Sequence, residues 1–143
     1  MVDLDERWRK LLEEGKVRWL AGMQGVGSRG CLGRVYHESM QRVGEPPRLN
    51  GMEYIWGAGG VSLGEIRSRI VPNWCDPATL GCLLALVREA WGDPALSVTA
   101  GHTKDRRVEW EVEHPHPDSL PEALWTYFDT EAEALVAALE AAP

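Results

Sequence analysis

Residues 76–94, with the sequence DPATLGCLLALVREAWGDP, give the clearest signal in the chain and predict a helix. Asp76 followed by Pro77 is typical of a helix start, because an acidic side chain can cap the first turn and proline suits the first helical position. The apolar residues then recur at helical spacing, at Leu80, Leu83, Leu84, Val87 and Trp91. Gly92 and Pro94 follow, so we expect the helix to end there.

The segments that follow predict strands and a last helix. Residues 106–114, RRVEWEVEH, alternate apolar residues with glutamates, which is the period of a strand with one buried and one solvated face. Strands are also expected at residues 96–100 and 124–128. Thr130 and Glu133 form a capping box at the start of a final helix. Residues 76–143 are therefore expected to run α-β-β-β-α.

The first half of the chain gives weaker signals. An amphipathic helix is predicted over residues 3–14, capped by Asp3 and stopped by Gly15. Residues 22–33 contain five glycines and are expected to form a flexible turn region. Other segments are expected to form strands at residues 17–21, 32–38 and 52–56, and a short helix at residues 62–69.

Length and composition fit one α+β domain. The chain has 143 residues, of which 44% are hydrophobic, so it can bury an ordinary core and is too apolar to be wholly disordered. We expect a single compact domain over residues 1–143, with an antiparallel sheet and two or three helices packed on one face. Residues 1–72 would contribute the N-terminal helix and the glycine-rich region, and residues 76–143 the α-β-β-β-α region.

Charge is distributed unevenly along the chain. The net charge is −7, but residues 1–72 carry +2 whereas residues 73–143, with 4 basic and 13 acidic side chains, carry −9. An acidic half disfavours direct nucleic-acid binding, because contacts with phosphates must neutralise negative charge. It is expected either to serve as a solvated surface or to meet a partner with a basic surface.

No targeting, membrane or metal pattern is apparent in the sequence. The N-terminus is charged and lacks an apolar signal segment, and no apolar run approaches the about 18 residues that would span a membrane. Cys31, Cys75 and Cys82 form no CxxC pair, and we expect them to be small buried hydrophobic residues in a reducing compartment. We therefore expect a cytoplasmic protein.

A glycine-rich string, GVGSRG at residues 25–30, matches the G-x-G-x-x-G pattern of dinucleotide-binding turns. That pattern needs a helix after the last glycine, and residues 31–36 do not read as one. A flexible hairpin loop is the favoured interpretation, with Arg29 and Arg34 as a weak candidate for contacting an anion. A small nucleotide-binding enzyme that uses Gly25–Gly30 is the alternative.

Catalytic and metal motifs are not recognisable elsewhere. His114 and His116, near Glu113 and Asp118, look superficially like metal ligands, but two prolines interrupt the strand and no third ligand has a recognisable spacing. We expect no catalytic residue, no metal and no cofactor.

Two features suggest a surface that binds a partner. Glu109, Glu111 and Glu113 lie on one face of a predicted strand, where they either protect the strand edge or form a comb of negative charge. Trp125 and Tyr127 share one face of the next predicted strand. They are expected either to pack in the core or to form a hot spot for a partner.

Residues 76–94 and the ending TEAEALVAALEAAP (residues 130–143) resemble segments that recur in uncharacterised small proteins of bacteriophages and prophages. The resemblance covers mainly residues 76–143 and carries no known activity, cofactor or site residue. It implies a phage setting, in which small acidic proteins often bind and block a host machine such as RNA polymerase or a CRISPR effector.

The sequence thus favours a non-enzymatic phage-type accessory protein in the host cytoplasm. Its expected partner is a host protein, or a protein–nucleic acid complex, with a basic surface. The alternatives are a structural component of the virion or its assembly, and the nucleotide-binding enzyme described above.

Overall fold

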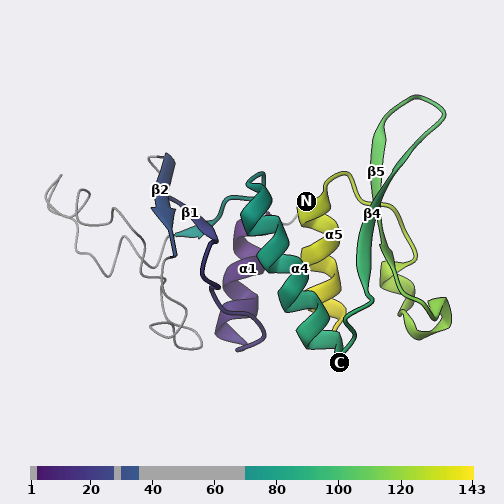
Figure 1. Cartoon of the computed structure of the whole chain (residues 1–143), viewed down its shortest axis with the longest axis horizontal. Coiled ribbons are helices and arrows are strands. Elements are labelled where there is room, and N and C mark those ends of the chain that lie inside the picture. The colour runs from purple at the N-terminus through teal and green to yellow at the C-terminus, as the bar shows by residue number, and fades with distance from the viewer. Residues whose placement is uncertain (1–2, 28–29, 36–69) are drawn as a thin grey trace, which may run out of the picture. The chain divides into compact units, whose positions relative to one another are not determined.

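A computed structural model describes residues 3–27, 30–35 and 70–143 (Figure 1). The strand expected at residues 52–56, the helix expected at residues 62–69, and Arg29 lie outside the described residues. The chain divides into two compact units, which we call the first unit (Met1–Cys82) and the second unit (Leu83–Pro143). The boundary falls within helix α4 (Pro77–Trp91).

Helix α1 (Leu4–Glu13) opens the first unit, and the helix predicted there is confirmed. The Asp3 side chain accepts a hydrogen bond from the Asp5 backbone N–H, which satisfies one of the unpaired donors of the first turn. At the other end Gly15 takes φ 70°, a left-handed conformation that glycine adopts without steric strain. The buried face carries Trp8 and Leu11.

A three-stranded antiparallel sheet follows, in the order β2-β1-β3, formed by β1 (Gln24–Gly27), β2 (Gly30–Arg34) and β3 (Val71–Pro72). The strand predicted at residues 17–21 is wrong, because this segment pairs with no other described strand. It is nevertheless anchored by burial of Val17 and Trp19. The Trp19 ring packs edge-to-face on Trp8, with centroids 5.6 Å apart, so aromatic packing rather than strand pairing holds this segment.

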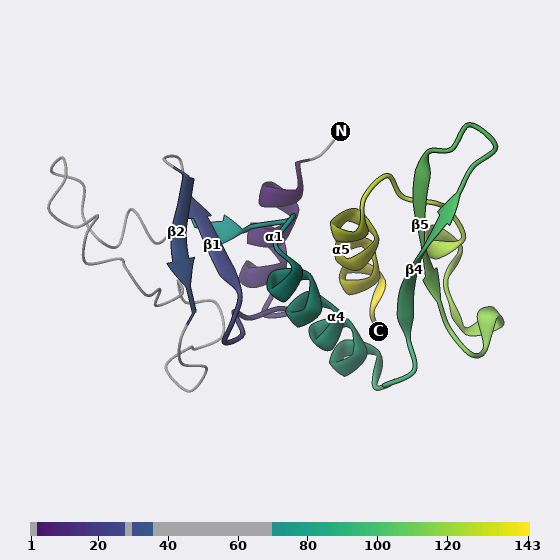
Figure 2. The same ribbon diagram turned by 45° about the horizontal axis from the view of Figure 1, so that its top comes forward.

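Besides the part of α4 from Leu83 onward, the second unit contains an antiparallel hairpin and the last helix (Figure 2). Strands β4 (Ser97–His102) and β5 (Val108–Glu113) pair from Ser97↔Glu113 to His102↔Val108. Helix α5 (Glu131–Ala141) contacts both strands and buries Leu135, Val136 and Leu139. The predicted capping residue is confirmed, since the Thr130 hydroxyl accepts from the Glu133 N–H at 3.1 Å.

The strand predicted at residues 124–128 is wrong. Pro121 instead starts a short 3₁₀ helix, η3 (Glu122–Leu124), and Trp125 follows it with φ −85° and ψ 43°, which is not an extended conformation. Only Phe128 pairs as a strand residue, through two backbone hydrogen bonds with Trp110 of 2.7 and 2.8 Å. A further 3₁₀ helix, η2 (Pro117–Ser119), precedes this segment.

The α+β class with antiparallel strands is confirmed. The described strands form two sheets rather than the single sheet expected. The single domain expected over residues 1–143 stays a prediction, and the two units are described separately. None of the helices in the described part of the chain has the length and apolar character needed to cross a membrane.

Candidate functional site

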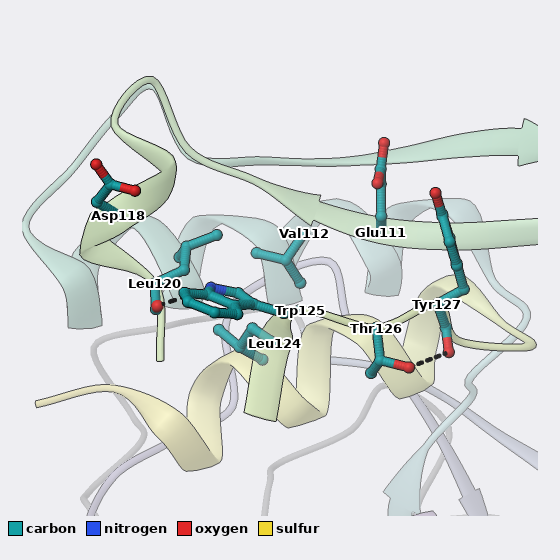
Figure 3. A pocket seen from close by; sticks show the side chains of 8 residues that line it. All are labelled: Glu111, Val112, Asp118, Leu120, Leu124, Trp125, Thr126 and Tyr127. Carbon is teal, nitrogen blue, oxygen red and sulfur yellow. Dashed lines mark hydrogen bonds between the residues drawn. The ribbon is translucent and has the colours of Figure 1, made fainter. Parts of the chain in front are cut away.

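A pocket of about 380 Å³ lies in the second unit between β5 and the segment that runs from η2 to Tyr127 (Figure 3). Its floor is apolar and is made by buried side chains of Val112, Leu120 and Leu124. Its rim is polar or aromatic, and consists of Glu111, Asp118, Trp125, Thr126 and Tyr127. Glu111 and Tyr127 project on the same side at one end of the pocket, and Asp118 lies at the other end.

Trp125 and Tyr127 are the most exposed large aromatic side chains that the structure describes, at 62% and 61% of their surface. The indole Nε1 of Trp125 donates to the Leu120 carbonyl at 2.9 Å, so the ring is held in place although its surface faces solvent. Tyr127 precedes Phe128, whose backbone is tied to Trp110 of β5. The expectation that these two residues pack in the core is therefore wrong, and their exposure is what a contact surface requires.

The three glutamates of β5 do not share one environment. Glu113 is exposed, whereas Glu109 and Glu111 are half-buried. Burial is the main cause that raises the pKa of Glu111, and the neighbouring Glu113 carboxylate adds to this through hydrogen bonding and like-charge repulsion. The expected alternation also weakens at the start of the strand, where Val108 is 44% exposed. Glu111 is thus the glutamate that joins the pocket.

The structure brings together three of the five residues predicted for partner binding, since Glu111, Trp125 and Tyr127 line the same pocket. Glu113 interacts with Glu111 from the same strand face, while Glu109 does not line the pocket. Asp118 was missed as a binding residue. No local pattern marks it, because it reaches the pocket only through the turn that follows β5.

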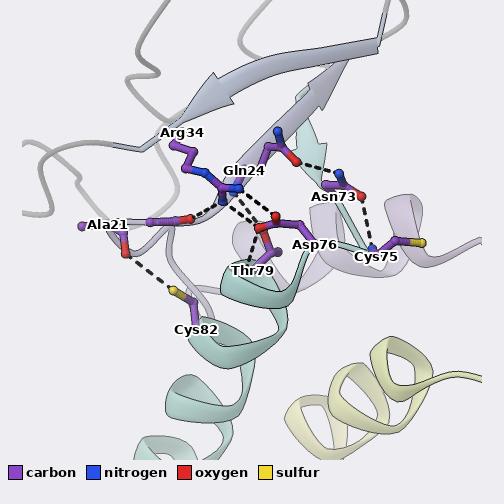
Figure 4. A network of polar contacts seen from close by, with 9 residues as sticks. Ala21, Gln24, Arg34, Asn73, Cys75, Asp76, Thr79 and Cys82 are labelled. Atoms are coloured by element: carbon purple, nitrogen blue, oxygen red, sulfur yellow. Dashed lines mark hydrogen bonds and ion pairs between the residues drawn. The ribbon is translucent and has the colours of Figure 1, made fainter.

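Arg34, the other predicted contact residue in the described part of the chain, is engaged within the first unit (Figure 4). Its guanidinium donates two hydrogen bonds to the Asp76 carboxylate, of 2.7 and 2.8 Å, and a third to the Gly22 carbonyl, of 3.0 Å. Asp76 also accepts from the Thr79 N–H at 2.9 Å and from its hydroxyl at 2.8 Å. The Arg34 guanidinium beside it holds the pKa of Asp76 well below its usual value of 3.8.

The glycine-rich string forms a β-hairpin. Gly25 and Gly27 lie in β1 and Gly30 begins β2, with Gly27 opposite Gly30. A dinucleotide turn needs a helix N-terminus at this point to face the pyrophosphate, and the chain here continues as a strand. The hairpin is confirmed, whereas the turn region expected over residues 22–33 is wrong, because residues 24–27 and 30–34 form paired strands. The nucleotide-binding alternative loses the geometry on which it depends.

The remaining candidate groups have structural partners or are isolated. Cys75 is exposed, so its expected burial is wrong, and Cys82 is half-buried with its Sγ 3.5 Å from the Ala21 carbonyl. His114 pairs with Asp93 through Nε2 and accepts from the His116 N–H through Nδ1 at 2.9 Å. Among the described residues, no three His, Cys, Asp or Glu side chains are grouped as metal ligands.

Comparisons with protein-family models, with curated proteins and with solved structures give no match. The function of the chain must therefore be argued from the pocket, its exposed aromatic rings and its carboxylates.

Proposed function

We propose that this chain is a non-enzymatic binding protein that docks a basic segment of a partner protein on its second unit. The docking surface consists of Glu111, Glu113, Asp118, Trp125 and Tyr127, and we call it the aromatic–acidic surface. The observation that carries the proposal is the exposure of Trp125 and Tyr127 around the pocket that Glu111 also lines.

Exposed aromatic rings favour a binding role because they leave apolar area in contact with water. Tryptophan and tyrosine are enriched among the residues that dominate binding energies at protein interfaces. Their side chains have few rotatable bonds, so they lose little conformational freedom on binding while they bury a large area. Trp125 is also held by its bond to the Leu120 carbonyl, so little further ordering is needed when a partner covers it.

Charge supports a basic partner rather than an acidic or neutral one. Residues 73–143 carry a net charge of −9, and the surface itself contributes three carboxylates. Such a field attracts a positively charged segment and raises its association rate. In the phage setting suggested by residues 76–94 and 130–143, the partner would be a host machine in the cytoplasm that normally presents its basic surface to nucleic acid.

A titration with defined peptides tests the proposal. The probes are short peptides that contain lysine and arginine, with glutamate-containing peptides of the same length as the control, followed by ¹⁵N–¹H NMR spectra. We expect saturable shifts confined to residues 109–113 and 118–127 for the basic peptides. The double variant E111K/E113K should weaken their binding by about tenfold or more, because it places like charges at the contact.

The matched control is E13K/E14K. These two exposed glutamates at the end of α1 give the same change in net charge on the other unit, at a helix end where positive charge is tolerated. The ion pair that Glu14 loses with Lys16 is exposed, and such pairs contribute little to stability. Equal weakening by both double variants would show that only net charge matters and would contradict the proposal. A virion component, the remaining alternative, predicts stoichiometric presence in purified particles and self-association without any basic peptide.

A further inference from the structure

The pocket floor and rim suit one long cationic side chain. Val112, Leu120 and Leu124 form a buried apolar base, on which the methylene stem of such a side chain can lie. Glu111 lines the same pocket from β5, and its carboxylate projects on the side where Tyr127 also projects, so the charged head has to extend past the apolar base to reach it (Figure 3). The arrangement matches a side chain that is apolar along its length and charged at its tip.

The exposed indole of Trp125 limits which chemical groups of a ligand it can bind. Because Nε1 of Trp125 already donates to the Leu120 carbonyl, the ring has no further hydrogen to offer. What remains available on its exposed surface is the π-system, which attracts cations. A ligand that depends on accepting a hydrogen bond from the indole therefore gains nothing here, whereas a planar cation gains from stacking.

The carboxylate of Glu111 has no cationic partner among the residues that the structure describes. No arginine or lysine in the described part of the chain pairs with it, and its near neighbour is the like-charged Glu113. Burial and this neighbour both disfavour its charge. A cation that enters the pocket would instead favour the charged form of Glu111. The site therefore suits a cation supplied by another molecule.

Arginine fits this combination better than lysine. Its guanidinium is planar, stacks on aromatic faces, is more weakly hydrated than an ammonium group, and presents a fork to a carboxylate. The first unit contains an example of that fork, in which Arg34 contacts both oxygens of Asp76 at 2.7 and 2.8 Å.

We infer that the pocket receives a single arginine side chain from the partner, stacked on Trp125 and paired with Glu111. This inference rests on the proposed docking of a basic segment. It adds the identity of the anchoring residue and assigns separate parts to the indole and the carboxylate.

The test uses the full chain and four peptides that differ at one position in a neutral background: arginine, lysine, trimethyl-lysine and citrulline. Calorimetry should give about tenfold tighter binding for the arginine peptide than for either lysine peptide. Only the guanidinium can both stack on the indole ring and contact both oxygens of the carboxylate. Citrulline keeps the shape and loses the charge, and should not bind measurably.

Two conservative variants assign the contacts. E111Q should weaken the arginine peptide about tenfold and leave the lysine peptide less affected, because a fork to both carboxylate oxygens is lost. W125F keeps a ring and should weaken the arginine peptide by a smaller factor, with the fold checked by circular dichroism. The matched control is E122Q, which alters an exposed carboxylate at the start of η3 that does not line the pocket, and it should change nothing.

The outcomes separate the two proposals. If arginine and lysine peptides bind this surface equally, or if E111Q binds arginine as tightly as the native chain does, the arginine assignment is wrong while docking of a basic segment stands. If trimethyl-lysine binds best, the pocket is an aromatic site for quaternary ammonium groups and the assignment is also wrong. If no basic peptide binds the surface at all, both proposals fail together.

Discussion

Asp76 in the first unit and Glu111 in the second unit are both half-buried carboxylates, yet their surroundings shift their pKa values in opposite directions. Asp76 accepts hydrogen bonds from Arg34 and Thr79, and its pKa falls. Glu111 is desolvated beside Glu113, and its pKa rises. Burial disfavours a charge unless opposite charge and hydrogen bonds are supplied with it.

Asp76 therefore has a structural role, whereas Glu111 is free of a cation in the described residues and can bind one. Asp76 closes a network that links β1, β2 and the start of α4, because Thr79 also accepts from the Gln24 N–H at 2.9 Å. Its interactions are complete within the first unit. Glu111 has no cation beside it among the described residues, and under the proposal above the partner's arginine supplies one next to the exposed rings of Trp125 and Tyr127.

The largest effect is expected for D76A. This change removes the side chain that caps α4 and leaves Arg34 without its carboxylate, so we expect the free energy of unfolding to fall by about 2–4 kcal/mol. Urea unfolding at pH 7 measures it. D118A is the control, because Asp118 is exposed and its loss should change stability by less than about 0.5 kcal/mol.

Lowering the pH should reduce the contribution of Asp76 to the free energy of unfolding. Because the pKa of Asp76 is lowered in the folded state, its stabilisation is present above the unfolded value of 3.8 and is lost as the pH falls further. The native chain and D76A should therefore differ less at pH 3 than at pH 7. A difference that stays constant with pH would mean that the carboxylate charge of Asp76 contributes nothing.

A smaller effect is expected for T130A, which tests a cap without an ion pair. The Thr130 hydroxyl satisfies one backbone N–H at the start of α5, and its loss should lower the free energy of unfolding by about 1 kcal/mol. The effect should not change between pH 3 and pH 7, since the hydroxyl does not titrate. If T130A proved as destabilising as D76A, the Arg34 pairing would add nothing to the cap.

The helix ends could be predicted from sequence because their causes are local. Asp3, Pro77 and Thr130 each act on backbone groups within the next few residues, so the sequence around them contains the full explanation. Strand β5 could likewise be predicted, from its alternating apolar residues and glutamates. Segments 17–21 and 124–128 have similar local patterns but lack extended partners along their length, and strand pairing depends on distant residues.

The site was only partly predictable for the same reason. Glu111, Trp125 and Tyr127 could be named from residue type, but the expected strand face is not what exposes the two rings. Their position follows from the turn at Pro121 and the single bridge between Trp110 and Phe128. The contact between Arg34 and Asp76 joins residues 42 positions apart, and no spacing rule predicts it.

The smallest effect on stability, and the one of opposite sign, is expected for E111Q. Its folded-state pKa is raised, so at pH 7 the ionised carboxylate opposes folding, and removing the charge should raise the free energy of unfolding by about 0.5 kcal/mol or less at this partly solvated position. The gain should fade as the pH falls towards 4.5, where the native carboxyl also becomes neutral. Urea unfolding at pH 7 and pH 4 measures both values.

A residue whose replacement stabilises the chain while weakening the binding of the arginine peptide is retained for binding at a cost in stability. Destabilisation by E111Q at pH 7 would instead place Glu111 with Asp76, among the carboxylates that hold the fold.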